Sequence, residues 1–167
     1  EKGISAYDVI NTMIAQFDSL LTDEWKAQLA TRGLSIHDWV TMASIVEKEA
    51  VVQEDRPIIA GVFYNRLDQG MLLQSCATVQ YALGEVKPVL TNEDVAVDSP
   101  YNTYIHEGLP PTPIASPGEA SLEAALYPAD TTYLFFVAKP NGAHIFTNTY
   151  ADHLAAIEAI ERGDYDN

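Results

Sequence analysis

The spacing of apolar residues predicts that the first 70 residues of the chain are largely helical. Apolar side chains recur there every three or four residues, which is the period of one helix face. Residue types that favour a helix start precede these segments: Ser5, Thr22 or Asp23, Ser35 and Pro57. Glycines that suit a helix end follow two of them, at Gly33 and Gly70. We therefore expect four helices, over residues 6–21, 23–33, 36–51 and 58–67.

Residues 71–118 carry a different pattern. Prolines interrupt this stretch and leave room for only one short helix, over residues 78–83. Its tyrosine and aliphatic content is too high for a disordered tether, which is typically polar and charged. We therefore expect a long, ordered, proline-rich loop that forms one wall of the domain and one side of a groove.

The C-terminal part mixes helix and strand signals. The run Thr131–Ala138 is rich in β-branched and aromatic residues, as is typical of a strand. Asn141-Gly142 is the signature of a two-residue hairpin turn into a second strand, over residues 143–147. Helices are expected on either side of the hairpin, from Ser116 or Pro117 to Leu126 and from about Tyr150 to Glu161. The pattern predicts a single α+β domain over residues 1–167, mostly helical, with a small antiparallel hairpin.

One acidic residue falls inside an apolar helix face. If residues 36–51 form a helix, Glu47 lies within the stripe formed by Trp39, Val40, Ala43 and Val46. A carboxylate in apolar surroundings loses hydration, so its pKa rises and it can serve as a general acid. The alternative is a glutamate at the edge of the helix that reaches solvent or a basic partner.

Composition narrows the classes of partner. The chain has 24 acidic and 9 Lys and Arg residues, a formal charge of −15, which repels phosphate backbones and argues against nucleic acid. Neutral sugars or peptides are easier to accommodate. No apolar run is long enough to span a bilayer, and no secretion signal opens the sequence. Glu1-Lys2-Gly3 reads like the middle of a longer protein, so we expect a fragment.

Other familiar chemistries find little support. His37, His106, His144 and His153 lie on separate predicted elements without a ligand pair at helical spacing, so we expect neither a metal nor a cofactor. Cys76 is the only cysteine, so an intrachain disulfide is impossible. There is no serine nucleophile elbow, P-loop or dinucleotide motif.

Carbohydrate binding is compatible with the loop. It offers amide, hydroxyl and aromatic side chains of the kinds that bind sugars, although the same residues also form turns and caps. A conventional glycosidase needs a second carboxylate, for which spacing leaves four candidates open: Asp55, Asp68, Asp94 and Asp98.

Several ordered blocks of the sequence resemble one known family. They are Ala43–Glu49, Gly61–Leu67, Leu73–Ser75 with Thr78–Tyr81, Tyr101–Tyr104, Gly108–Gly118, Tyr133–Val137 and Gly142–Phe146. In this order, over nearly the whole chain, they resemble the catalytic domain of the endolytic murein transglycosylase family (MltG, YceG-like).

The resemblance implies a lysozyme-like lyase of bacterial cell-wall biogenesis. Such an enzyme cleaves the β-1,4 bond between N-acetylmuramic acid and N-acetylglucosamine in nascent peptidoglycan glycan strands and leaves 1,6-anhydromuramic ends. Family members act at the outer face of the cytoplasmic membrane, where one N-terminal transmembrane helix anchors them and a small LysM-like module precedes the catalytic region. Neither the anchor nor a full module is visible in this sequence. Cell-wall synthases are the partners that the resemblance suggests.

The resemblance also implies site residues. The family's catalytic glutamate falls on Glu47, which would act first as general acid and then as base. Glu49 is a possible supporting carboxylate. Sugar binding is carried over to Gln74, Thr78, Tyr81, Tyr101 and Asn102. Cys76-Ala77 departs from the Asp-Pro of other members, and we assign Cys76 no catalytic role.

Two alternatives remain open at this point. A non-catalytic peptidoglycan-binding module would use Glu47 only to bond a sugar hydroxyl. A hydrolase of the lysozyme kind would add water to the broken bond.

Overall fold

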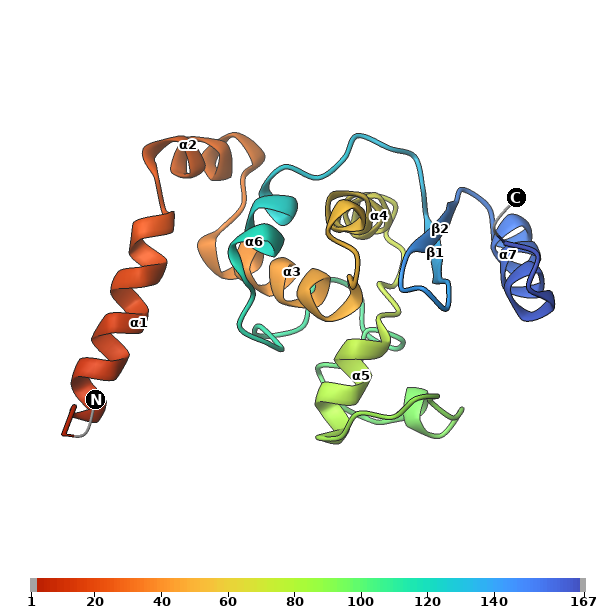
Figure 1. The fold of residues 1–167 in the computed structure, drawn as a ribbon, viewed down its shortest axis with the longest axis horizontal. Coiled ribbons are helices and arrows are strands. Elements are labelled where there is room, and N and C mark those ends of the chain that lie inside the picture. Colours follow the sequence, from red (N-terminus) through yellow and green to blue (C-terminus); the bar gives the residue numbers. More distant parts are fainter. Residues whose placement is uncertain (1–2, 166–167) are drawn as a thin grey trace. The chain divides into compact units, whose positions relative to one another are not determined.

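The computed structural model describes residues 3–165 as a helical protein with one small sheet (Figure 1). Its α-helices are α1 (Ala6–Leu20), α2 (Asp23–Arg32), α3 (Ile36–Glu49), α4 (Arg56–Asp68), α5 (Cys76–Leu83), α6 (Glu119–Leu126) and α7 (Tyr150–Arg162). Two 3-10 turns, η1 (Gln53–Asp55) and η2 (Asp94–Ala96), and an antiparallel hairpin of β1 (Phe135–Ala138) and β2 (His144–Thr147) complete it. The expected mostly helical α+β fold is confirmed.

The local signals for the early helices are also confirmed. The Ser5 hydroxyl accepts from the Asp8 backbone and the Asp8 carboxylate accepts in return, which is a capping box at the start of α1. Thr22 caps α2, and Gly33 ends it in the left-handed conformation. Pro57 lies in the first turn of α4, where its missing N–H costs nothing.

The hairpin differs from the sequence expectation in two ways. Its first strand begins at Phe135 rather than Thr131, because side chains of α4 take the backbone carbonyls of the preceding segment. The Asn65 side-chain amide donates to the carbonyls of Thr131 and Tyr133, at 2.9 and 3.0 Å.

The turn is also longer than two residues. Residues 139–143 connect the paired residues Ala138 and His144. The Gly142 N–H donates to the Lys139 carbonyl at 2.9 Å, and Gly142 has a φ of +86°. Pro140 therefore occupies the second position of a four-residue turn, where its fixed φ fits, and Gly142 follows in the left-handed region.

The chain divides into two compact units, residues 1–35 and 36–167. In the first unit, α1 has no buried residue. Val9, Ile10, Met13 and Ile14 are all more than 40% exposed. A helix with an exposed apolar face contributes no core of its own.

The core of the 36–167 unit is built around α3, which packs against α4 and α6 (Figure 1). Its Trp39 is fully buried, and the indole N–H donates to the Leu122 carbonyl of α6 at 2.8 Å. The Ser44 hydroxyl accepts from the backbone N–H of Ile114 at 3.0 Å, which ties the proline-rich loop to the same helix. The loop is therefore an ordered part of this unit, as predicted.

Gly61 permits a close approach between α4 and the segment after α6. A Cβ atom at this position would lie 2.7 Å from the Ala129 carbonyl oxygen, a main-chain atom that cannot move cheaply. We expect Gly61→Ala to lower the free energy of unfolding by about 1–2 kcal/mol, because overpacking outweighs the gain of about 1 kcal/mol in helix propensity. Urea denaturation measures the sign, and a more stable variant would contradict this packing.

Candidate active site

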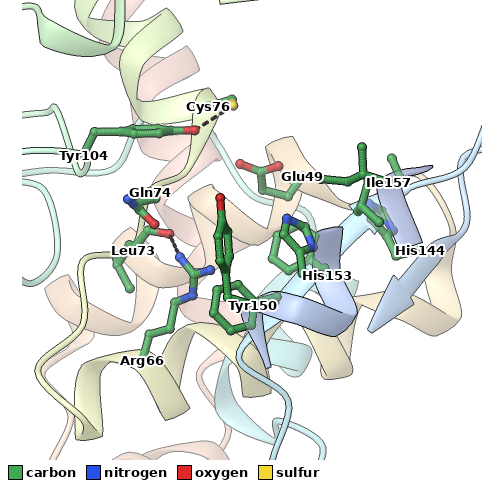
Figure 2. Close-up of a pocket in the computed structure, with 14 residues that line it drawn as sticks. Glu49, Arg66, Leu73, Gln74, Cys76, Tyr104, His144, Tyr150, His153 and Ile157 are labelled. Atoms are coloured by element: carbon green, nitrogen blue, oxygen red, sulfur yellow. Dashed lines mark hydrogen bonds between the residues drawn. The ribbon is translucent and has the colours of Figure 1, made fainter. Parts of the chain in front are cut away.

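A cavity of about 490 Å³ lies between the end of α3, α4, the loop and the hairpin with α7 (Figure 2). Its size falls within the range of about 300–1,000 Å³ that is typical of small-ligand sites. We call it the main cavity. Its lining includes apolar side chains of the hairpin and a set of polar or ionisable groups: Glu49, Arg66, Gln74, Cys76, Tyr104, His144, Tyr150 and His153.

Glu49 is the carboxylate that faces the main cavity. It is the last residue of α3, and its carboxylate accepts a hydrogen bond from the Ser75 hydroxyl. Burial raises the pKa of Glu49, while the bonds with Ser75 and the Ala77 backbone and the nearby His144 act in the opposite direction. The negative end of a helix also disfavours a carboxylate charge. A carboxyl group that holds its proton beside a cavity has the properties of a general acid.

Glu47 occupies a different environment. Its carboxylate accepts from the Ser121 hydroxyl at 2.6 Å and from the Gly118 backbone N–H at 3.2 Å. These groups belong to the start of α6, whose N-cap residue is a glycine without a side chain to cap the helix. The Ser121 bond is the main cause that lowers the pKa of Glu47, with Gly118 and Arg56 adding to it.

The prediction that apolar surroundings raise the pKa of Glu47 is therefore wrong. The apolar stripe of α3 does face the core, but it meets the N-terminus of α6, which attracts a negative charge. Glu47 serves as the missing cap of α6 and does not line the main cavity. Glu49 is two residues further on, about 200° around the helix, and so faces the opposite side.

Gln74 lies in the main cavity wall, where a substrate-binding role was predicted (Figure 2). Its φ of +50° is a left-handed conformation that few residues other than glycine adopt. The Thr103 carbonyl accepts from the Gln74 N–H at 3.0 Å, and the Thr103 hydroxyl accepts from the Ser75 N–H at 3.0 Å. Two adjacent backbone bonds thus hold the strained residue at the cavity.

Thr78 and Asn102 do not reach the main cavity, although we predicted that both bind substrate. Both are fully buried. The Asn102 amide donates to the carbonyls of Val95 and Val97, and its oxygen accepts from the Tyr104 N–H, at 2.8–3.0 Å. The Thr78 hydroxyl is bonded to Ser75 and Thr103. These side chains hold the loop in place, and substrate binding by Thr78 and Asn102 stays a prediction.

Tyr81 and Tyr101 lie elsewhere. Their rings pack together with centroids 4.7 Å apart, and neither lines the main cavity. Tyr81 lines a smaller cavity of about 370 Å³, together with Lys48, Gln80 and Ile114. The structure thus separates the predicted substrate-binding residues into one at the main cavity, one at the smaller cavity and three at neither.

The sequence reasoning missed five polar side chains of the main cavity: Arg66, Tyr104, His144, Tyr150 and His153. Tyr104 hydrogen-bonds to the Cys76 sulfur at 3.2 Å, and burial raises the pKa of both groups. Arg66, Tyr104 and His144 do fall within the sequence blocks that carry the family resemblance. That position in the blocks was the available signal, but spacing alone does not tell a cavity residue from a packing residue.

The aspartates considered as a second carboxylate do not line the main cavity. The Asp55 carboxylate binds the backbone N–H and the Nδ1 of His144, at 2.8 and 2.9 Å, and so orients that imidazole. Asp94 pairs with Lys87 at 2.6 Å, which lowers its pKa to about 2. Within residues 3–165, Glu49 is the single carboxylate of the cavity wall.

Neither a metal cluster nor a membrane span is found among residues 3–165. No three His, Cys, Asp or Glu side chains gather closely enough there to hold a metal ion. No helix in this range combines the length and apolar character needed to cross a bilayer.

Comparisons with known proteins place the chain in a family. The model of the YceG-like family matches residues 1–159. The chain belongs to the YceG-like family. A crystal structure of a YceG-like protein from Listeria monocytogenes superimposes with a TM-score of 0.84 at 44% identity, over 93% of this chain and 50% of that one.

Relatives of the chain carry a functional name. The endolytic murein transglycosylase of Bacillus subtilis strain 168 is 46% identical over 154 residues, which is 92% of this chain and 42% of that protein. The endolytic murein transglycosylase of Streptococcus pneumoniae serotype 2 is 38% identical over 151 residues, 87% of this chain and 27% of that protein. The chain thus spans less than half the length of either relative.

The contact between Glu47 and α6 predicts a pH-dependent contribution to stability. Because the folded-state pKa of Glu47 is below its ordinary value of 4.5, this contribution is present above that value and is lost as the pH falls through the lowered pKa. We expect Glu47→Gln to lower the free energy of unfolding at pH 7 by about 0.5–2 kcal/mol. Urea denaturation from pH 7 to pH 3 should show the difference from wild type shrinking with acidification.

The exposed Glu107 provides the matched control for this measurement. Glu107→Gln removes the same charge away from any helix start, and we expect it to leave the pH dependence of stability unchanged. Equal curves for the two variants would contradict the capping role of Glu47.

Proposed function

We propose that this chain is the catalytic region of an endolytic murein transglycosylase, and that Glu49 rather than Glu47 is its general acid and base. The observation that carries the proposal is a single carboxylate with a raised pKa in the main cavity of a YceG-like fold. The names of two relatives support murein as the substrate. The site of action would be the cell wall, at the outer face of the cytoplasmic membrane.

The proposed reaction balances with one carboxyl group. Protonated Glu49 donates its proton to the glycosidic oxygen as the bond from that oxygen to C1 of N-acetylmuramic acid breaks. The C6 hydroxyl oxygen of the same sugar closes on C1 and forms the 1,6-anhydro ring. The Glu49 carboxylate accepts the proton that this hydroxyl releases, so the enzyme returns to its starting state and no water is consumed.

The composition of the cavity wall favours this reaction over hydrolysis. Conventional glycosidases place two carboxyl groups about 5–9.5 Å apart, one to protonate the leaving group and one to attack or to activate water. Among residues 3–165, Glu49 is the one carboxyl group that lines the main cavity. The Asp55 carboxylate is hydrogen-bonded to His144 instead. A substrate hydroxyl as the nucleophile makes the second carboxylate unnecessary.

Neutral groups around Glu49 suit sugar binding. Gln74 and the hydroxyls of Tyr104 and Tyr150 supply donors and acceptors, and the rings of Phe135 and Phe136 supply apolar surface. Ser75 holds the Glu49 carboxyl group in place from the start of α5. We propose that the strained backbone at Gln74 fixes its amide toward the substrate.

The two glutamates of α3 give a matched test of the catalytic assignment. We expect Glu49→Gln to reduce release of anhydromuropeptides from peptidoglycan at least about 100-fold, the usual contribution of a general acid. Its stability at pH 7 should not fall, because an amide is neutral without taking up a proton and so suits a site that disfavours charge. Glu47→Gln should keep most of the activity at temperatures where it is folded. Product chromatography and thermal denaturation measure both effects.

The opposite result would return the assignment to Glu47. An active Glu49→Gln variant beside a folded, inactive Glu47→Gln variant would contradict the proposed acid. Digestion in H₂¹⁸O separates the classes of function: a lyase gives unlabelled anhydro ends, a hydrolase gives labelled reducing ends, and a binding module gives neither.

The hydrogen bond from Ser75 makes the pH profile testable. Activity should decline at alkaline pH as Glu49 loses its proton, and the Ser75 bond lowers the pKa at which this happens. Ser75→Ala removes that bond, so we expect the alkaline limb of kcat/KM to move to higher pH while the maximal rate falls. Ser19→Ala, in α1, removes a hydroxyl that bonds only to its own helix and should leave the limb in place. A limb that moves to lower pH would contradict the assignment.

A further inference from the structure

Arg66 is a buried cation in the wall of the main cavity. It extends from α4, and only 8% of its surface is exposed. Its Nε atom donates to the Leu134 carbonyl at 2.6 Å, and its Nη1 atom donates to the carbonyls of Leu73 and Leu72 at 2.9 and 3.2 Å. Its guanidinium carbon lies 5.1 Å from the centre of the Phe135 ring. These contacts fix the plane of the guanidinium group (Figure 2).

The remaining nitrogen, Nη2, has no hydrogen-bond partner among residues 3–165. No carboxylate in that range forms an ion pair with Arg66 either, although the chain has 24 acidic residues. Three neutral carbonyls satisfy the other donors but leave the positive charge unbalanced. Buried charges in proteins are normally paired, so an unpaired one beside a cavity favours an anion as its partner.

The other ionisable groups of the main cavity do not supply that anion. Burial raises the pKa of Glu49 and of the Cys76 thiol, which favours their neutral forms. Burial and the Arg66 charge lower the pKa of His153, which favours its neutral form as well. The Asp55 carboxylate is hydrogen-bonded to the Nδ1 atom of His144 and does not line the cavity. Arg66 is therefore the fixed charge of the cavity wall, inside a chain that is strongly acidic overall.

We propose that Nη2 of Arg66 binds a carboxylate of the muramoyl part of the substrate and thereby determines which sugar lies beside Glu49. This inference rests on the proposed function. N-acetylglucosamine has no carboxylate, whereas N-acetylmuramic acid carries a lactyl group. Its carboxyl group is free in peptide-stripped strands, and in peptide-bearing strands the attached stem peptide supplies carboxylates of its own. An arginine fork held in one plane is suited to either source.

The selectivity follows from the chemistry of the lyase reaction. An anhydro ring forms only if the sugar on the C1 side of the broken bond is placed next to Glu49. A carboxylate contact present on one of the two alternating sugars would set that register. Arg66 would then act as a specificity-determining residue through ground-state binding, without taking part in proton transfer.

Small ligands and the wild-type chain test the proposal directly. N-acetylmuramic acid, its methyl ester and N-acetylglucosamine share a sugar ring but differ in the carboxylate. Calorimetry and NMR titration at low salt should show N-acetylmuramic acid binding about tenfold or more tightly than the ester, as expected for a charge-assisted bond. The preference should shrink in high salt. An N-acetylmuramoyl dipeptide identifies the source, since its carboxylate lies on the peptide: tighter binding of the dipeptide indicates the stem, and tighter binding of the acid indicates the lactyl group.

Variants add a second, independent comparison. Arg66→Gln should lose the preference for the acid over the ester. Arg162→Gln is the control, because this exposed residue pairs with Glu158 and Asp164 on α7 and the following turn, and its loss changes the net charge equally. Arg66 also binds three backbone carbonyls, so Arg66→Gln is checked by circular dichroism first. If it does not fold, the wild-type ligand comparison decides.

Equal binding of the acid and the ester to the wild-type chain would overturn the proposal, and so would a folded Arg66→Gln variant that keeps the preference. If either result is found and the wild-type chain still cuts strands to anhydro ends, only the proposed role of Arg66 fails. If no anhydro ends form but the carboxylate preference is present, the carboxylate site stands and the proposed lyase reaction fails.

Discussion

The site depends on how α3 presents two glutamates to two opposite environments. Glu47 and Glu49 are two residues apart, so their side chains leave the helix about 200° from each other. One meets the N-terminus of α6, where two donors and the helix dipole favour its charge. The other lies beside the main cavity, where burial disfavours its charge and the bond from the Ser75 hydroxyl offsets part of that effect. The same side-chain chemistry therefore yields a structural cap at one position and, at the other, a carboxyl group whose pKa is raised.

Several polar side chains of the proline-rich loop form hydrogen bonds that hold the backbone of the loop itself. The Asn102 side-chain amide donates to and accepts from backbone atoms of the loop, and Thr103 holds the backbone of Gln74 and Ser75. The result is that Gln74 and Tyr104 reach the main cavity, while Thr78 and Asn102 do not. Sequence blocks shared with a family therefore combine residues that position the site with residues that form it, and burial distinguishes the two.

The electrostatics of the main cavity contrast with those of the whole chain. The formal charge of −15 repels anions at long range, and that field is screened within about 8–10 Å at physiological salt. Inside the cavity the carboxyl group tends to be neutral and the fixed charge is the positive one of Arg66. Short-range contacts in a partly desolvated site would therefore outweigh the overall repulsion of a substrate carboxylate.

Local chemistry in the sequence was enough to predict most helices, because caps such as Ser5 and Thr22 and stops such as Gly33 act on their immediate neighbours. The hairpin could be predicted, but its first strand is shorter than expected because Asn65, far along the chain, takes carbonyls that strand pairing would use. The apolar stripe of α3 also showed correctly which face is buried. What the stripe packs against was decided by the tertiary structure alone, and a carboxylate facing the N-terminus of α6 behaves oppositely to one in an apolar pocket. Periodicity records burial but not the polarity of the neighbour, which is why the sequence singled out Glu47 and the fold favours Glu49.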